Sequence, residues 1–312
     1  MSGKTHKPQI VADIRRPSTA ELNPADYAGR LSVSVVVYYA DVAELSRCLD
    51  CFKTPVVSDI VIWDNSSIPD TRTYLRKHYP NVKYIASENI GYGPGHNRAY
   101  AAVDGNAPYH LVVNSDIEFD PAILTELVAV MDKNPSINLI HPMLVGLKGY
   151  RQYSVRKLPT PADLLMRRFI PDTWFRRQRK DYLLCDLDTS RAWHLPYVQG
   201  SFMLLRCSKF EEAGLFDERF FMYPEDIDLS RRLFPHGGIV YYPFVKAMHV
   251  HRHQSYSSGR LLRVHIRNMI KYFNKWGWFF DSERRVINRS IDEEVRAFRK
   301  TPGFRPATYH HW

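Results

Sequence analysis

The sequence predicts an α/β fold in which a mostly parallel central sheet carries helices on both faces and a helical extension follows at the C-terminus. Three observations predict it. Short β-branched apolar runs alternate with segments of helical periodicity through the first half of the chain, as in repeated βαβ units. Polar residues of the kind that bind ligands follow directly after several of these runs. The segment Gly259–Trp276 has an apolar and a basic face at a period of 3.6 residues.

The expected strands are short and mostly apolar. Four lie in the first half of the chain, at 31–39, 59–63, 82–86 and 109–113, and three less regular ones follow at 137–141, 198–206 and 238–242. Parallel strands joined by right-handed helical crossovers are typical of nucleotide-binding α/β architectures.

Length and composition indicate one large domain with appendages. The chain has 312 residues, of which 45% are hydrophobic and 24% charged, as in ordinary globular proteins. We expect a loose polar arm over 1–30, an α/β domain over 31–255 with a basic and aromatic insertion at 145–195, and an amphipathic helical region over 256–312. No apolar run is long enough to cross a bilayer, and no secretory signal is visible, which predicts a cytoplasmic protein.

Positive charge is concentrated in two windows, and the formal net charge of +10 favours an anionic partner. The first window mixes cations with apolar residues; its cations are Arg167, Arg168, Arg176, Arg177, Arg179 and Lys180. The second is the helix Gly259–Trp276, whose basic face holds Arg260, Arg263, Arg267 and Lys271. Its apolar face suits either the core or lipid and holds Leu262, Ile266, Met269, Ile270 and Phe273. Trp276, Trp278, Phe279 and Phe280 then favour peripheral contact with an anionic membrane surface.

The four cysteines, Cys48, Cys51, Cys185 and Cys207, are too few and too scattered for a disulfide framework. Cys48 and Cys51 form a CxxC inside an expected helix whose apolar face includes Leu45. Packing is therefore favoured over a redox or zinc role.

The segment 214–233, GLFDERFFMYPEDIDLSRRL, places Glu225, Asp226 and Asp228 close together beside aromatic residues. Carboxylates are rarely buried without a partner or a task, so one of them is a candidate base. The alternative is that they only cap and solvate the first turn of a helix ending near Phe234.

A second acidic motif, Asn114-Ser115-Asp116, directly follows the apolar run 109–113. In open parallel sheets ligands bind beyond the carboxyl ends of strands, so Asp116 would project into the ligand crevice. One carboxylate can hold Mg²⁺ when phosphate oxygens and water complete its coordination. A simple Asx turn is the alternative.

Two loops suggest nucleotide contacts. Asp64 opens the loop DNSS, where its carboxylate could accept hydrogen bonds from a base or ribose, or belong to a plain turn. The loop from Asn89 to Arg98 opens a helix, and its glycines permit close approach of a diphosphate to the helix N-terminus. It matches neither the GxGxxG nor the GxxxxGK[ST] pattern, which disfavours hydride-transfer enzymes and P-loop NTPases.

Three histidines, His249, His251 and His253, alternate along the chain and would share one face of a strand. One of them near Asp116 could complete a site for Mn²⁺ or Mg²⁺. A separate three-histidine zinc site is the alternative.

Taken in order, these motifs resemble the inverting glycosyltransferases of family 2, with a Rossmann-like GT-A fold, and especially bacterial enzymes that build O-antigen, capsule or other cell-surface polysaccharide. The resemblance spans 31–290 and rests on SVVVYY, IWDNSS, ENIGYGPGHNRAY, LVVNSDIEF, YVQGSFMLLR, GLFDERFFMYPEDIDLSRRL, the His249 region and IKYFNKWGWFF. It implies a nucleotide-binding half over 31–120 and an acceptor half over 121–255.

The resemblance implies a role for each motif. Asp226 would be the catalytic base, with Glu225 as second candidate, and Asp116 would bind Mg²⁺ or Mn²⁺ with His249 or His251. The nucleotide diphosphate would contact Asp64, Asn89, Gly91, Asn97, Arg98, Asn114 and Ser115. The donor sugar and acceptor would lie near Gly200, Ser201 and Tyr223.

The family's DxD motif is replaced here by Asn114-Ser115-Asp116, as in rhamnosyltransferase-like members, which leaves one carboxylate for the metal. The resemblance implies dTDP-L-rhamnose as donor, ahead of UDP- or GDP-sugars. The acceptor would be a polysaccharide or a glycan on a polyprenyl diphosphate at the inner face of the cytoplasmic membrane. Removal of the acceptor proton by Asp226 would give inversion in a single displacement.

The competing class is a non-catalytic nucleic-acid-binding protein, which the net charge permits. No RNA-recognition motif is visible, and the basic windows lie outside the expected sheet, so no nucleic-acid partner is expected. A nucleotidyltransferase is disfavoured because no basic phosphate loop follows the first strand. The sequence does not predict the oligomeric state.

Overall fold

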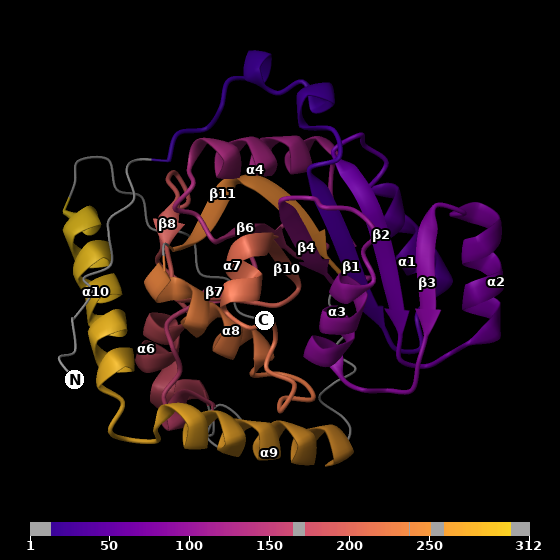
Figure 1. Cartoon of the computed structure of the whole chain (residues 1–312). Coiled ribbons are helices and arrows are strands. Elements are labelled where there is room, and N and C mark those ends of the chain that lie inside the picture. Colours follow the sequence, from indigo (N-terminus) through magenta and orange to yellow (C-terminus); the bar gives the residue numbers. More distant parts are fainter. Residues whose placement is uncertain (1–13, 165–171, 237, 251–258, 301–312) are drawn as a thin grey trace.

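The computed structural model describes residues 14–164, 172–236, 238–250 and 259–300. In this part of the chain a nine-stranded sheet of order β3-β2-β1-β4-β10-β6-β11-β5, with β8 paired to β11, forms the centre of the molecule (Figure 1). The strands are β1 (Leu31–Val37), β2 (Val57–Asp64), β3 (Val82–Ala86), β4 (Tyr109–Val113), β5 (Ile117–Glu118), β6 (Leu139–Val145), β8 (Trp193–His194), β10 (Phe202–Arg206) and β11 (Ile239–His249). β7 (Val155–Arg156) and β9 (Tyr197–Val198) form a separate two-stranded sheet.

The nucleotide-binding type of topology is present in the first half of the sheet. β1 pairs in parallel with β2 and β4, and β2 pairs in parallel with β3. β10 then runs antiparallel between β4 and β6, and β6 pairs in parallel with β11. Because β10 is antiparallel to β4, the residues just before β10 lie at the same sheet edge as those just after β4.

Helices cover both faces of the sheet (Figure 1). They are α1 (Val42–Asp50), α2 (Pro69–His78), α3 (Tyr92–Ala101), α4 (Ala122–Lys133), α6 (Asp172–Tyr182), α7 (Cys207–Glu212), α8 (Glu225–Leu233), α9 (Gly259–Trp276) and α10 (Ser282–Arg299). Short 3₁₀ helices occupy Thr19–Glu21, Pro24–Tyr27 and Phe234–His236. None of these described helices combines the length and the apolarity that a bilayer-spanning helix needs.

The two faces of the sheet bury two separate cores. Leu111 and Val113 pack into the first core with residues of α1 and α4, whereas Val112 between them packs into the second core with residues of α8, α9 and α10. Successive side chains of a strand point to opposite faces, so one fully buried strand serves both cores. This explains why residues 111–113 of β4 are apolar without alternation.

Residues 14–30 differ from the predicted loose arm. Ile14 is buried, and the guanidinium of Arg16 donates to the carboxylate of Glu126 in α4 at 2.9 Å. Glu126 is itself buried and also accepts a hydrogen bond from Tyr242, so the arm supplies the cation that this carboxylate needs. The remaining part of the arm, 1–13, lies outside the described residues.

The stretch 145–195 is also more integrated than an insertion, since Leu158 and Trp193 are buried in the second core. The predicted strand 198–206 is interrupted around Gly200, where the chain turns from β9 into β10. Cys48 and Cys51 are buried free thiols, in agreement with the packing role.

Helix α9 has the predicted bounds, and the core interpretation of its apolar face holds for Met269 and Phe273, which are buried. Ile270 was assigned to the same face by the periodicity, but it is 43% exposed. Arg263, Arg267 and Lys271 are exposed, as predicted.

Candidate active site

Three strand ends bring the predicted site residues to one edge of the sheet. Asp64 at the end of β2 pairs with Val37, and Val113 at the end of β4 pairs with both Val35 and Phe202. The backbone N–H of Asn114 donates to the carbonyl oxygen of Ser201 at 3.1 Å. The motif after β4 and the turn before β10 are therefore in direct contact, although they are far apart in sequence.

Asp226 lies in the first turn of α8 with its carboxylate held in a fixed position. One oxygen accepts hydrogen bonds from the backbone N–H of Gly200 at 3.0 Å and from the hydroxyl of Tyr197 at 3.3 Å, and the other accepts from the N–H of Ile227 at 2.8 Å. Burial raises the pKa of Asp226 to about 6, although these hydrogen bonds and the charge of Arg156 oppose the rise. Asp226 is therefore mostly ionised at neutral pH and still a competent base.

Glu225 is the neighbouring buried carboxyl group. Burial, and then the charge of Asp226, raise the pKa of Glu225 well above its ordinary value. Its Oε2 atom has no hydrogen-bond partner among the described residues, and the same holds for the buried hydroxyl of Ser201. Buried polar atoms are normally satisfied, so these two atoms are candidates for ligand contact.

The first-turn acids of α8 do more than cap the helix, because Asp228 anchors α8 to α9. Its carboxylate accepts a hydrogen bond from the indole of Trp276 at 2.7 Å and contacts Lys275 Nζ at 2.6 Å. Arg231, on the same helix, is a buried cation paired with the buried carboxylate of Asp281 at 2.6 Å. These contacts hold the helix that carries Asp226.

Tyr92, the first residue of α3, connects the strand ends. Its hydroxyl lies 2.8 Å from Asn114 Oδ1 and 2.8 Å from the carbonyl oxygen of Gly200. Burial and then the charges of the nearby carboxylates, including Asp226 and Asp116, raise the pKa of Tyr92 well above its ordinary value. Asn114 stands two residues before Asp116, and the N–H of Gly200 donates to Asp226, so the Tyr92 hydroxyl connects the two segments that carry these acids.

Asp116 contacts the end of β11, where His249 Nε2 lies 3.3 Å from Asp116 Oδ2. The other ring nitrogen of His249 is held by the side-chain oxygen of Gln152 at 2.9 Å, and Gln152 also donates to the backbone oxygen of His249. The imidazole is therefore fixed with Nε2 toward Asp116. His251 and His253 lie outside the described residues, as does the three-histidine alternative that depends on them.

Asp116 and His249 supply some, but not all, of the ligands that a divalent cation needs. An imidazole nitrogen and a carboxylate oxygen suit Mn²⁺, and diphosphate oxygens and water normally complete such a site. Among the described residues no group of three or more His, Cys, Asp or Glu side chains could hold a metal by itself. Asp116 and His249 would therefore hold the ion only together with the ligand's own oxygens.

Asp64 is buried, and its carboxylate accepts hydrogen bonds from the backbone and hydroxyl of Ser66 and from the hydroxyl of Tyr84. The neighbouring Asn65 donates to the carbonyl oxygen of Gly91 at 3.0 Å. The end of β2 is therefore attached to the glycine-rich loop before α3. Asp64 therefore stabilises the turn after β2, and it lies at the edge of the sheet where the other predicted site residues also lie.

Gly91 marks a close approach between the glycine-rich loop and the segment before α8. Its φ of +104° is strained for other residues, and a Cβ atom there would lie 2.4 Å from the carbonyl oxygen of Phe221. The same oxygen accepts a hydrogen bond from the N–H of Tyr92. Asn89 closes the loop by accepting a hydrogen bond from the N–H of Gly91 at 3.1 Å.

Asn97, predicted to contact the nucleotide, uses its side-chain amide inside the protein, whereas Arg98, predicted for the same role, forms an ion pair at the surface. The amide of Asn97 exchanges hydrogen bonds with the backbone N–H and carbonyl of Phe216, at 3.0 and 2.9 Å. Arg98 pairs with Glu218 at 2.9 Å. Both residues brace α3 against the segment that leads to α8.

The remaining predicted positions lie around the same turn and helix. A Cβ atom at Gly200 would lie 3.3 Å from the Cβ of Asp226, so a small residue allows the close contact there. Ser115 is partly exposed beside Asp116. Tyr223 has a φ of +93° and packs its ring edge-on against His265.

Sequence reasoning did not single out Tyr92, Gln152 or Arg156. In the sequence, Tyr92 is one residue of the glycine-rich loop. Its position between Gly91 and Gly93 is the local feature that indicates a role for it in the site. Gln152 and Arg156 lie in the stretch predicted as an insertion, and the site residues on which they act, His249 and Asp226, are distant in sequence.

With this geometry in place, comparisons with known proteins define the class. The chain belongs to glycosyl transferase family 2, whose profile matches residues 32–214. It is therefore a glycosyltransferase, which confirms the predicted family and enzyme class and excludes the competing interpretation as a non-catalytic nucleic-acid-binding protein.

Two similar proteins are rhamnosyltransferases. The N-acetylglucosaminyl-diphospho-decaprenol L-rhamnosyltransferase of Mycobacterium tuberculosis (strain ATCC 25618 / H37Rv) is 30% identical over 240 residues, which cover 72% of this chain and 77% of that protein. Rhamnosyltransferase WbbL of Escherichia coli (strain K12) is 29% identical over 230 residues, covering 71% and 82%.

Solved structures share the fold. The structure of GalNAc-T7 with UDP, GalNAc and Mn²⁺ superposes with a TM-score of 0.56 at 15% identity, over 88% of this chain and 55% of that one. The predicted GT-A fold is thereby confirmed.

Proposed function

We propose that this chain transfers L-rhamnose from dTDP-L-rhamnose to a hydroxyl group of a lipid-linked glycan or cell-surface polysaccharide, with inversion at the anomeric carbon. The observation that carries the proposal is the position of the Tyr92 hydroxyl, which lies 2.8 Å from Asn114 Oδ1 in the Asp116 motif and 2.8 Å from the carbonyl oxygen of Gly200, whose N–H donates to Asp226. The two rhamnosyltransferase relatives support the choice of sugar. Transfer from a UDP- or GDP-sugar is the alternative.

Asp226 acts as the base in this mechanism. Its carboxylate takes the proton of the acceptor hydroxyl while the oxygen attacks the anomeric carbon from the face opposite the diphosphate. The N–H groups of Gly200 and Ile227 keep the carboxylate in one orientation during the step. One displacement at one carbon inverts its configuration.

Asp116 and His249 would hold Mg²⁺ or Mn²⁺ at the diphosphate. The ion supplies positive charge that stabilises the leaving group. Gln152 fixes the tautomer and the direction of the His249 ring through its hydrogen bond to Nδ1. The Mn²⁺ in the GalNAc-T7 structure supports a divalent ion in this fold.

The donor would contact the loops at the sheet edge. We assign the nucleoside to Asp64, Asn89 and Gly91, and the diphosphate side to Asn114 and Ser115. The sugar would lie near Gly200 and Tyr223, where the unsatisfied buried oxygens of Ser201 and Glu225 can meet its hydroxyl groups. Asn97 and Arg98 support this region from behind rather than bind the donor.

The acceptor class is taken from the mycobacterial relative, whose name gives a decaprenol diphosphate glycan. Such an acceptor would place this enzyme at the inner face of the cytoplasmic membrane. Phe279 and Phe280 are 75% and 92% exposed and follow a helix whose Arg263, Arg267 and Lys271 are exposed. Aromatic rings beside cations suit an anionic lipid surface.

The donor is tested by measuring product formation with dTDP-L-rhamnose, UDP-sugars and GDP-sugars, with and without Mn²⁺. We expect turnover with dTDP-L-rhamnose that EDTA abolishes. Turnover with only a UDP- or GDP-sugar would replace the proposed donor while leaving the enzyme class intact.

The base is tested with a matched pair, Asp226→Asn and Glu225→Gln, which keep the shapes of the two side chains. Loss of a general base costs about 10²–10⁴ in rate, so we expect this fall in kcat for Asp226→Asn with dTDP affinity unchanged. Glu225→Gln should fall less than about tenfold, because burial and the charge of Asp226 raise the pKa of Glu225 and so favour its uncharged form. A reversed order would assign the base to Glu225.

Membrane contact is tested by co-sedimentation with phosphatidylglycerol vesicles. The variant Phe279→Ser/Phe280→Ser should lose vesicle binding. The control Leu147→Ser/Tyr150→Ser, which removes two other exposed apolar side chains, should bind as the wild type does. Equal binding by all three proteins would reject the assignment of this surface.

A further inference from the structure

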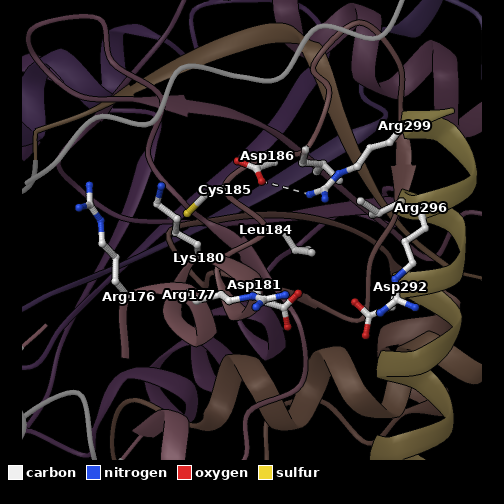
Figure 2. Close-up of a pocket in the computed structure, with 12 residues that line it drawn as sticks. Arg176, Arg177, Lys180, Asp181, Leu184, Cys185, Asp186, Asp292, Arg296 and Arg299 are labelled. Atoms are coloured by element: carbon white, nitrogen blue, oxygen red, sulfur yellow. Dashed lines mark hydrogen bonds and ion pairs between the residues drawn. The ribbon is translucent and has the colours of Figure 1, made fainter. Parts of the chain in front are cut away.

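A cavity of about 850 Å³ lies between α6 and α10, at the side of the molecule where α10 runs along the outside (Figures 1 and 2). Five cationic side chains line it: Arg176, Arg177 and Lys180 from α6, and Arg296 and Arg299 from α10. None of the residues proposed for transfer lines this cavity. Part of the basic window that the sequence assigned to a membrane surface therefore forms the wall of a cavity.

The cavity keeps an excess of positive charge after its own carboxylates are counted. Asp181 and Asp292 both contact Lys157, whose side chain is 5% exposed, and Asp186 pairs with Arg299 at 3.1 Å. The five lining cations exceed the three lining carboxylates, which leaves a formal excess of two positive charges. A concave surface of one sign concentrates the field that attracts a counter-ion.

The arrangement of the cations suits a ligand with more than one phosphate group. Figure 2 shows Arg296 and Arg299 reaching the cavity from α10, with Arg176 and Lys180 on the opposite side. Guanidinium groups bind phosphate oxygens through two parallel N–H donors, and several on separate walls can engage adjacent phosphates.

We propose that this cavity binds a diphosphate group, carried by a soluble or a lipid-linked molecule, at a site separate from the catalytic residues. Arg177 and Arg296 provide the test because they stand on opposite walls and are both exposed. Their replacement changes the charge of the cavity without removing a buried contact.

The first experiment is calorimetric titration of the full chain with inorganic diphosphate in EDTA, which removes binding that depends on a divalent ion at Asp116. Arg177→Gln/Arg296→Gln should weaken diphosphate binding about tenfold or more. The matched control Arg76→Gln/Lys77→Gln removes the same charge from exposed positions of α2 and should change affinity less than about twofold. dTDP binding with Mn²⁺ should be unchanged in both variants.

The second experiment separates the two sources of the diphosphate. Phosphatidylcholine vesicles with and without polyprenyl diphosphate are sedimented with the same three proteins. If only the cavity variant loses binding to the diphosphate-bearing vesicles, the ligand is lipid-linked. If the cavity variant loses affinity for inorganic diphosphate in the calorimeter but binds the vesicles as the wild type does, the ligand is soluble. No binding of either probe by the wild type, or equal losses in the two variants, would overturn the proposal.

Discussion

Asp226→Asn should make the stability of this protein less sensitive to pH. The pKa of Asp226 is raised by burial from 3.8 to about 6, so the folded state binds this proton more tightly than the unfolded state. The sign follows from linkage: the stabilisation is fully present below pH 3.8 and is lost as pH rises through 6. Ionised Asp226 therefore destabilises the fold at the pH where it is an active base.

The magnitude follows from the shift. A difference of about two pKa units corresponds to about 2.5 kcal/mol of unfolding free energy between pH 4 and pH 7.5, because at pH 4 the unfolded-state carboxyl is already partly ionised. Asparagine also disturbs the hydrogen bond from the N–H of Ile227, but that cost does not depend on pH and cancels in the comparison. Removal of the Asp226 charge also lowers the pKa of Glu225, which reduces the pH dependence of the variant further.

The assay is urea unfolding of wild type and Asp226→Asn at pH 4 and pH 7.5, followed by tryptophan fluorescence. The wild type should lose about 2.5 kcal/mol more than the variant over this interval, while its kcat/KM rises through the same pH range. The control is Glu218→Gln, which removes a partly exposed carboxylate paired with Arg98. Its unfolding free energy should change between the two pH values as that of the wild type does, within about 1 kcal/mol. Equal losses in wild type and Asp226→Asn would refute the reasoning.

Three further predictions concern parts of the structure that hold the site. Gly91→Ala should lower the free energy of unfolding by about 1–3 kcal/mol or more, because Gly91 has a φ of +104° and a carbonyl oxygen would lie 2.4 Å from the new Cβ. The control Gly149→Ala, at a φ of +77° with open space around it, should cost less when both variants are unfolded in urea. Arg231→Met should cost about 3–5 kcal/mol of unfolding free energy, since it leaves the Asp281 carboxylate buried without its principal cation; a loss below 1 kcal/mol would contradict this. His249→Ala should raise the Mn²⁺ concentration for half-maximal activity at least about tenfold, and an unchanged Mn²⁺ titration would remove His249 from the metal site.

The parts of the fold that depend on local pattern could be predicted from the sequence. β3 and β4 have the expected bounds because each is a short run rich in β-branched and aromatic residues, and α9 has its expected bounds because its amphipathic period is strong. Asp116 and Asp226 could be nominated because one follows a strand and the other begins a helix. These signals need only a few neighbouring residues.

The contacts that assemble the site could not be predicted in this way. The hydroxyl of Tyr92 meets residues 22 and 108 positions away, and Gln152 meets His249 at a separation of 97. Asn97 looked like a ligand residue, whereas its partner Phe216 is 119 positions away. The cavity between α6 and α10 likewise depends on how two distant helices pack.

The most direct test of the proposed transfer is the anomeric configuration of the first product, followed by ¹H NMR during turnover with the donor that the enzyme accepts. A single displacement assisted by Asp226 predicts a glycoside of configuration opposite to that of the sugar nucleotide from the first time point. A product that retains the donor configuration would contradict the mechanism, because it would require an intermediate that one base and one displacement do not form.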